Sequence, residues 1–583
     1  MSIVIIPGAK VPEIPDEQFE SFLAAIGVHN VSATDKAEYK SILQSFLAVM
    51  KKVDSDPDYT PPSLDSEPAA SDRTYTVPDP EDNPMNAWSH LCEIMNTGPS
   101  LPGLLQGRTF AIKDNISVAG LPTTIGLSPE LFEGGKYEPA AVDATVVARI
   151  LAAGAVVKGT STCEGWCASP LSYTSFTGHV HNPWLYGHSS GGSSSGSAAL
   201  VAARRMQNIF PANTDSILPI DTKTHTSTIP TAEIALGSDQ AGSVRIPASY
   251  CGIYGLKPTF GLVPYTGVAS MSPMIDHLGP MASSLEDIAA VLETIAGYDG
   301  LDPRMSPESP LRQNVKPYAA ILADFRDRDV TEVSTWKIGL LKEGFEMPGV
   351  TDEVRDTILA TARSCFEAAG ATVVDVSVPM HANGAVLWNA STRPSMATWL
   401  LQGRASGHLT YLPPHIKPVT GKLPLSDNED GLRATSLLNE YTPAAINILL
   451  SQHATNEQLP AGLEAKAHRQ VLGLRAAYNA ALQDVDVLIT PCAPNIARPL
   501  PSPTASVAEK LAYAIGTTNN TAPFNATGHP AMNVPCGFLS SPSQPKAMLP
   551  VGMQVIGKRF EDETVLLAAA LYEKGREILK SSD

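Results

Sequence analysis

Three short segments, far apart in the chain, hold residue types that can activate a serine without histidine or metal. Lys113 follows an apolar run, a glycine- and serine-rich segment spans residues 191–197, and a polar turn runs from Gly237 to Arg245. Hydrolysis of an amide needs a nucleophile, a group that removes its proton, and donors for the developing oxyanion. The three segments contain candidates for each role, so they predict a serine-lysine hydrolase.

The polar turn has features that a plain connection would not require. Gly242 allows the backbone to approach a ligand closely just before Ser243. Consecutive backbone amides in such a turn can bind an oxyanion. Asp239 and Arg245 are expected to form an ion pair that supports the turn without taking part in the chemistry.

Lys113 has a role in this chemistry only if its surroundings favour the neutral amine. A lysine at the end of an apolar strand is usually solvated, and a solvated lysine carries a charge. Burial disfavours the ammonium form, so a buried Lys113 could act as a base that draws a proton through a serine.

Two other interpretations of the glycine- and serine-rich segment are open. A phosphate-binding loop would need a lysine before the helix, but this segment continues into Ser197 and three apolar residues. Gly192 to Gly196 also matches the Gly-x-Ser-x-Gly elbow of α/β-hydrolases, which would make Ser194 the nucleophile. The elbow leaves Lys113 and the polar turn without a role, so it is the rival mechanism.

Composition excludes several classes of protein. The 583 residues carry a net charge of -18, which makes a phosphate backbone an unfavourable partner, so nucleic acid is not expected. There is no run of eighteen apolar residues and no basic flank at the N-terminus, so neither a membrane span nor a signal peptide is predicted. We expect a cytoplasmic protein.

The cysteines do not form a pattern typical of disulfides or metal sites. Seven are scattered along the chain, an odd number that argues against a secreted disulfide framework. Cys163 and Cys167 lie close together but lack a second Cys or His pair nearby, which disfavours zinc. We therefore expect reduced, buried thiols and neither metal nor cofactor.

Periodicity predicts a helical N-terminal segment followed by an α/β domain. Apolar residues at helical spacing mark a helix over 35–53, and a Pro-rich connection completes a segment of residues 1–84. Strand and helix patterns then alternate over residues 85–583, which predicts a central β-sheet. Residues 206–231 and the irregular region 379–437 are expected to be insertions into this domain.

The three segments together resemble the amidase signature family. The likeness covers roughly residues 85 to 575 and extends through further segments: Asp143–Val147, Arg245–Ser249, Cys251–Thr259, Gly261–Gly267, Asp276–Pro280 and Phe524–Ala531. It implies a mixed central β-sheet covered by helices on both faces. It also implies that Ser243 attacks the acyl carbon, that Ser193, preceded by a cis peptide bond, relays the proton, and that Lys113 receives it.

The resemblance assigns further roles around these residues. The amides of Gln240, Ala241, Gly242 and Ser243 would form the oxyanion hole, with Ser194, Asp239 and Arg245 in support. Glu164, Trp166, Ala168 and Phe176 are weak candidates for the substrate pocket. Close relatives often have Phe where this chain has Ala168, which would enlarge or reshape the pocket.

Within the family, the chain looks most like broad-specificity amidases that hydrolyse aliphatic and aromatic primary amides. Such relatives are commonly dimers, so a small-molecule amide is the expected substrate and a homodimer is a possible assembly. Carbamates and anilides present the same carbonyl, so a carbamate hydrolase using the same triad is an alternative. A non-catalytic subunit or an amidotransferase-type subunit is a further alternative.

Overall fold

The computed structural model describes residues 12–57, 61, 72–96, 103–209, 230–329, 335–401, 429–502 and 504–582. The chain divides into two compact units, Met1–Asp65 and Ser66–Asp583. Most of the expected insertion 206–231 and the middle of the expected insertion 379–437 lie outside the described residues.

The described residues of the first unit form two helices, α1 (Asp16–Ala25) and α2 (Ala33–Ser55). The Ser32 side chain caps α2 by accepting a hydrogen bond from the Asp35 amide at 3.1 Å. The helix predicted over 35–53 is confirmed within this longer one. Leu43 and Leu47 pack against a small apolar cluster made by α1 and the residues before it.

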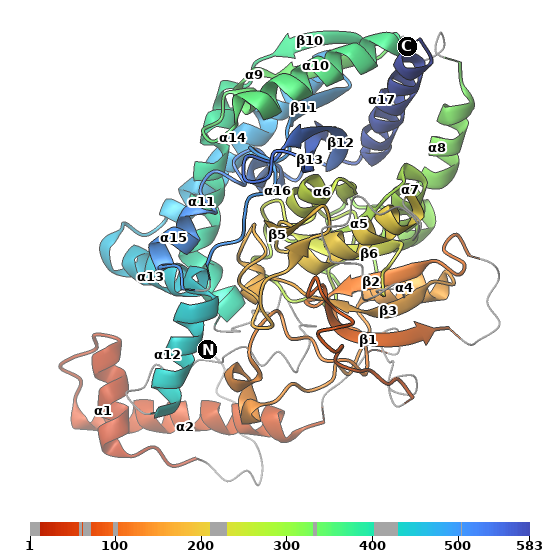
Figure 1. The fold of residues 1–583 in the computed structure, drawn as a ribbon. Helices are drawn as coiled ribbons and strands as arrows, with labels where there is room; N and C mark the ends of the chain where they lie inside the picture. Colours follow the sequence, from red (N-terminus) through yellow and green to blue (C-terminus); the bar gives the residue numbers. More distant parts are fainter. Residues whose placement is uncertain are drawn as a thin grey trace. The chain divides into compact units, whose positions relative to one another are not determined.

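The second unit is built on an eleven-stranded mixed sheet, drawn in Figure 1. Its strand order is β1-β3-β2-β6-β8-β7-β12-β13-β11-β9-β10. The strands are β1 (Trp88–Met95), β2 (Thr109–Lys113), β3 (Val156–Ser161), β6 (Ile234–Asp239), β7 (Tyr254–Lys257), β8 (His277–Ala282), β9 (Lys337–Leu341), β10 (Thr372–Val376), β11 (Val487–Pro491), β12 (Ala531–Ser540) and β13 (Met548–Ile556). Strands β3, β2 and β6 run parallel, as do β11, β9 and β10, while the strands between these groups pair antiparallel.

Helices cover both faces of the sheet because successive side chains of each strand point to opposite faces. On β2, Phe110 and Ile112 enter one apolar core, whereas Ala111 enters another. The first core is closed by α4 (Thr145–Ala152), α7 (Leu285–Ile295), α8 (Tyr318–Asp327), α10 (Asp352–Ala368) and α17 (Asp562–Ser582). The opposite face is covered by α5 (Ser195–Ile209), α6 (Arg245–Cys251), α11 (Gly384–Met396), α13 (Pro443–Gln458), α14 (Leu463–Asp484) and α16 (Ala522–Thr527). The predicted α/β fold class is confirmed.

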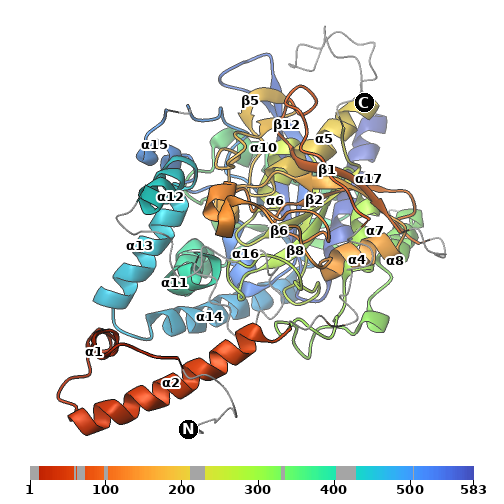
Figure 2. The ribbon, with the colours of Figure 1, turned by 90° about the horizontal axis from the view of Figure 1, so that it is seen from below.

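The expectation of an irregular region from residue 379 was wrong for the part that the structure describes. Residues 379–401 are helical, and α11 packs against α13, α14 and α16, as Figure 2 shows. Pro394 lies inside α11, and the buried Leu387 and Trp388 are followed by Asn389, Ser391 and Thr392, which interrupt the apolar pattern. An internal proline normally ends a helix, so the sequence pattern concealed this one. The helix α12 (Glu429–Tyr441) opens the next described stretch of chain.

The remaining short elements connect these layers. They are β4 (His181–Asn182), β5 (Leu185–Ser189), α9 (Lys342–Phe345) and α15 (Val507–Ala512). Among the described residues, no helix is both long enough and apolar enough to cross a membrane.

Candidate active site

Lys113 ends β2 and is fully buried at the carboxyl end of the parallel strands. Its Nζ lies 2.8 Å from Ser193 Oγ, 2.8 Å from Ser238 Oγ and 3.2 Å from Ser238 O. Asn115 Nδ2 also donates to Ser238 Oγ, at 3.0 Å. The amine is therefore surrounded by three oxygens, one of which belongs to the predicted relay serine.

The glycine- and serine-rich segment enters α5 directly beside the polar turn. The Gly192–Ser193 peptide bond is cis, as the resemblance implied. The Ser194 amide donates to the Ser243 carbonyl at 3.2 Å, and Ser194 Oγ donates to Ser238 O at 3.3 Å. These bonds bring Lys113, Ser193 and Ser243 into one place although the two serines are 50 positions apart in the sequence.

The polar turn between β6 and α6 is held by the Asp239 carboxylate. Its oxygens accept from the Gly242 amide at 2.7 Å, from the Val244 amide at 3.1 Å, and from the Arg245 guanidinium at 2.9 and 3.0 Å. Burial would raise the pKa of Asp239, but the charge and hydrogen bonds of Arg245 and a bond from Asn525 outweigh burial. The pKa is held well below its usual range, so Asp239 is ionised and the pair is a permanent brace for the turn.

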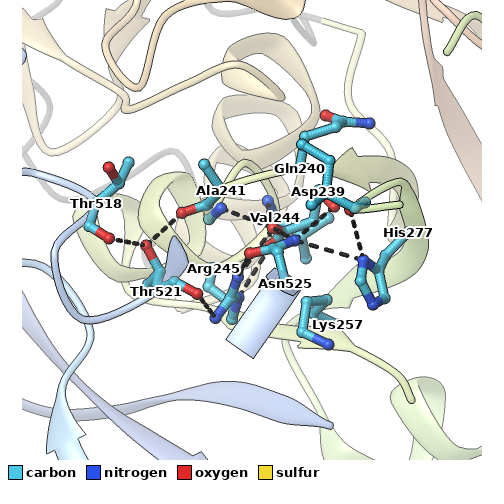
Figure 3. Close-up of polar contacts among 12 residues, drawn as sticks. Asp239, Gln240, Ala241, Val244, Arg245, Lys257, His277, Thr518, Thr521 and Asn525 are labelled. Atoms are coloured by element: carbon cyan, nitrogen blue, oxygen red, sulfur yellow. Dashed lines mark hydrogen bonds and ion pairs between the residues drawn. The ribbon is translucent and has the colours of Figure 1, made fainter. Parts of the chain in front are cut away.

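Arg245 ties this turn to the C-terminal part of the chain, as Figure 3 shows. Its guanidinium donates to Thr521 O at 3.0 Å, to Asn525 Oδ1 at 2.6 Å and to Gln554 Oε1 at 2.6 Å. Asp239 and Arg245 are both fully buried. The ion pair expected from the sequence is therefore the centre of a network that joins β6, α6, α16 and β13.

Three backbone carbonyls of the turn accept hydrogen bonds from protein groups. The N–H of the same peptide unit therefore points away from those groups. In a trans peptide the C=O and the following N–H are antiparallel. The Asp239 carbonyl accepts from Asn525 Nδ2 at 2.8 Å, the Gln240 carbonyl from Trp388 Nε1 at 2.8 Å, and the Gly242 carbonyl from the Ile246 amide at 2.7 Å.

The amides that follow these three carbonyls belong to Gln240, Ala241 and Ser243. Within the part of the chain that the structure describes, none of the three donates a hydrogen bond. The Gly242 amide differs, because Asp239 already accepts its hydrogen. The Gly242 amide, expected as an oxyanion donor, is thus occupied in this structure, whereas the conformation of Gly242 is what the turn requires. Its φ is +136°, and a Cβ would lie 2.4 Å from Thr521 Oγ1.

A cavity of about 190 Å³ opens beside Ser243. It is lined by Cys167, Ala168, Ser169, Pro170, Tyr173, Thr174, Gln240, Ala241, Ser243, Met271, Trp388, Asn389, Arg393, Met396, Pro443, Ala444, Asn447, Ile448, Leu511, Ala514 and Thr518. Of the four weak pocket candidates, the structure places Ala168 in the lining. Trp166 is instead buried in an apolar core, and Phe176 packs edge-to-face on Tyr441.

Glu164, the remaining pocket candidate, is a fully buried brace. Its Oε2 accepts from the Thr174 amide at 2.6 Å and from the Thr174 hydroxyl at 2.7 Å, and its Oε1 accepts from Ser195 Oγ at 2.9 Å. The Glu164 amide donates to the Ser193 carbonyl at 3.2 Å. Burial raises the pKa of Glu164 to about 7, against the lowering effect of the bonds from Thr174 and Ser195. Glu164 thus connects the Ser193 loop to a wall of the cavity.

The two neighbouring cysteines are free and buried. Cys167 lines the cavity, and its thiol lies close to Cys163 and Ser193. Among the described residues, no three His, Cys, Asp or Glu side chains form a group that could hold a metal ion.

Three site residues escaped the sequence analysis: Ser238, Trp388 and Thr521. Ser238 lies inside the polar turn motif, so its place between Gly237 and Asp239 was an available signal. Trp388 and Thr521 hold the Gln240 and Ala241 carbonyls from segments far away in the sequence. No local pattern marks these two residues.

Comparisons with known proteins find relatives that match most of the chain. A family model described as Amidase matches residues 95–208 and 229–566. The chain is 34% identical over 514 residues to an enantioselective amidase of Rhodococcus rhodochrous, covering 87% of this chain and 86% of that one. It is 32% identical to a glutamyl-tRNA(Gln) amidotransferase subunit of Methanosarcina mazei, covering 81% and 85% of the two chains. The solved peptide amidase of Stenotrophomonas maltophilia superimposes with a TM-score of 0.59 at 26% identity, covering 81% and 83%.

Proposed function

The chain belongs to the Amidase family, and on that premise we propose that it hydrolyses the C–N bond of aliphatic or aromatic carboxylic amides to a carboxylic acid and ammonia. The reaction would pass through an acyl-enzyme on Ser243. The observation that carries this proposal is the buried hydrogen bond of 2.8 Å between Lys113 Nζ and Ser193 Oγ, beside the turn that holds Ser243.

Acylation begins with attack of Ser243 Oγ on the amide carbon. Ser193 Oγ accepts the proton of Ser243 and passes its own proton to the neutral amine of Lys113. A neutral amine has two N–H groups and one lone pair. The Ser238 carbonyl and hydroxyl lie at hydrogen-bonding distance for the two N–H groups, which leaves the lone pair for the Ser193 hydroxyl. Ser238 thus orients the base.

The tetrahedral intermediate carries a negative charge on the former carbonyl oxygen. The amides of Gln240, Ala241 and Ser243 are free to donate to it, because their partner carbonyls are anchored elsewhere. Donors held in place before the reaction stabilise the charge without reorganisation. Peptide geometry supports this assignment, because each of these N–H groups points away from the anchored carbonyl that precedes it.

Collapse of the intermediate requires a proton on the leaving nitrogen. The proton held by Lys113 returns through Ser193 to the leaving nitrogen of the substrate, and ammonia departs. Water then attacks the acyl-enzyme while the same relay accepts its proton. The carboxylic acid leaves and Ser243 recovers its hydrogen.

The test is ammonia release from hexanamide, benzamide and phenylacetamide. Ser243→Ala should lower kcat at least 10³-fold, since removing the nucleophile of a catalytic triad reduces kcat by this factor or more. Ser194→Ala is the matched control, because Ser194 lies beside the relay but would be the nucleophile only in the elbow mechanism. Activity that survives Ser243→Ala and disappears in Ser194→Ala would overturn the proposal in favour of the elbow.

Carbamates and anilides present the same carbonyl to Ser243, so a carbamate hydrolase is the alternative on the same triad. Hydrolysis of benzyl carbamate, measured by release of its alcohol product, distinguishes the two functions. An amidotransferase-type role, suggested by relatives such as the Methanosarcina mazei protein, predicts that other subunits copurify and that the isolated chain releases little ammonia.

We also propose a cytoplasmic homodimer. The α2 residues Tyr39, Ile42, Phe46 and Met50 lie at helical spacing and are more than 40% exposed within the chain. An apolar stripe of this kind is typical of helices that pair. Light scattering of the wild type and of Phe46→Asp measures whether the stripe is needed for dimerisation.

A further inference from the structure

Arg393 is an unusual residue in the cavity beside Ser243. It comes from α11 and is the one Lys, Arg, Asp or Glu among the described residues that line the cavity. Much of the remaining lining is apolar, including Met271, Trp388, Met396 and Ile448. A single positive charge thus faces a substrate-sized space, and no carboxylate belongs to the described part of its wall.

The Arg393 guanidinium has no partner among the residues that the structure describes. Nε and Nη1 are buried, and neither makes a hydrogen bond there. The unpaired side-chain acceptor of the same lining, Gln240 Oε1, is not bonded to it either. Burial lowers the pKa of Arg393, and no acid among the described residues raises it.

An arginine in this situation indicates a missing anion. Buried charges in proteins are normally paired and hydrogen-bonded, because an uncompensated charge is costly to remove from water. Two other arginines that are buried or nearly so follow that rule: Arg245 is held by Asp239, and Arg73 by Asp143. Arg393 departs from it at the site where a substrate would bind.

We propose that Arg393 binds a carboxylate at the end of the substrate's acyl group remote from the scissile carbonyl, so that the preferred substrates are monoamides of dicarboxylic acids. This inference rests on the proposed amidase function. The planar guanidinium offers two parallel N–H donors to a carboxylate. The apolar walls contact the hydrocarbon between the two ends.

The first experiment compares matched pairs of substrates. The monoamide of adipic acid is compared with hexanamide, and 4-carbamoylbenzoate with benzamide. The wild type should prefer the carboxylated member at least tenfold in kcat/KM, since hydrogen bonds between a guanidinium and a carboxylate are stronger than neutral ones. Preference for the neutral member, or no preference, would overturn the proposal.

Variants then assign the preference to Arg393. In Arg393→Met the ratio of the two kcat/KM values should fall at least tenfold, and Arg393→Lys should recover part of it. Arg469→Met is the matched control, because Arg469 is an exposed arginine of α14 outside the cavity lining. This variant removes the same positive charge from the protein and should leave the ratio of the two kcat/KM values unchanged. An unchanged ratio in Arg393→Met would refute the assignment.

A binding measurement separates this inference from the catalytic proposal. Ser243→Ala leaves Arg393 in place, so calorimetry with the adipic monoamide and with hexanamide tests recognition without turnover. Tighter binding of the carboxylated ligand supports the inference even if no substrate is hydrolysed. Equal or weaker binding contradicts it even if the wild type is an active amidase. This readout also serves if Arg393→Met fails to fold.

Discussion

Single residues in this site divide into those that would touch the substrate and those that hold others in place. Gln240, Ala241 and Ser243 line the cavity. Asp239, Glu164 and Ser238 lie outside the described lining and bond to groups that position the site. Glu164 is the clearest example, because its buried carboxyl group braces the loop that carries Ser193, the proposed relay serine. Titration of Glu164 should therefore change the stability of the folded state.

At the residue scale we predict a pH-dependent stability from Glu164. Its pKa is raised by burial from 4.5 to about 7, so the folded state binds this proton more tightly than the unfolded state. The contribution of Glu164 to stability is therefore fully present below pH 4.5 and is lost as the pH rises through 7. The slope is at most about 1.4 kcal/mol per pH unit. Urea unfolding at several pH values measures it.

Glu164→Gln is the matched comparison for this prediction, because it keeps the shape and cannot titrate. Asp276 and Asp562 also have pKa values raised to about 6, and they titrate in both proteins. The difference in unfolding free energy between wild type and variant should therefore change between pH 4.5 and 7. A constant difference over this range would show that Glu164 is not the group responsible.

At the scale of elements, α11 shows how a helix distant in sequence completes the site. Its Trp388 donates to the Gln240 carbonyl, and its Arg393 and Met396 line the cavity. The helix is held by α13, α14 and α16, so its position depends on packing in the second core. A segment expected to be peripheral thus contributes both to the support of the Gly237–Arg245 turn and to the lining of the cavity.

For this element we predict the effect of Trp388→Phe. The variant keeps an aromatic ring in the core but removes the hydrogen bond to the Gln240 carbonyl, so the Ala241 amide loses its orientation. Removal of one oxyanion donor costs about 10²–10³ in kcat, and loss of its orientation alone should cost about tenfold. KM should change much less. Steady-state kinetics with a saturating primary amide measures both.

Trp184→Phe is the control for this variant. Trp184 Nε1 donates to the Cys251 carbonyl at the same 2.8 Å, but Trp184 lies outside the cavity lining. Its loss should affect stability while leaving kcat within a factor of two or so of the wild type. Equal losses of kcat in the two variants would mean that Trp388 acts through general stability.

At the scale of the molecule, the Asp239–Arg245 pair joins parts of the second unit that are about half the chain apart. Arg245 reaches Thr521, Asn525 and Gln554 from the N-terminal half of the sheet. The pair lies where α6 packs on β7, β12 and β13. The turn that carries Ser243 is therefore supported by bonds that link both parts of the second unit.

We expect Arg245→Met to lower the free energy of unfolding by about 3–5 kcal/mol, because it leaves the buried Asp239 charge unpaired. Urea denaturation followed by tryptophan fluorescence measures the loss. The double variant Asp239→Asn with Arg245→Met should lose clearly less than the sum of the two single variants, since no charge is then left unpaired. Additive losses would show that the pair is not coupled.

Much of this protein could be predicted from sequence because its chemistry lies in contiguous motifs. The alternation of strands and helices determined the α/β class, and three segments marked Lys113, Ser193 and the Ser243 turn. Each of these is a local property of the backbone and of neighbouring side chains. The helix over 35–53 was visible for the same reason.

Tertiary structure decided which groups in and around those motifs are free to act. The Gly242 amide is taken by Asp239, Glu164 supports a loop, and the cavity walls come from α11 and α13. Trp388 bonds to the Gln240 carbonyl, and Arg393 lines the cavity beside the turn, although about 150 residues of chain separate both from it. Such contacts depend on the complementarity of whole surfaces, which no local spacing encodes.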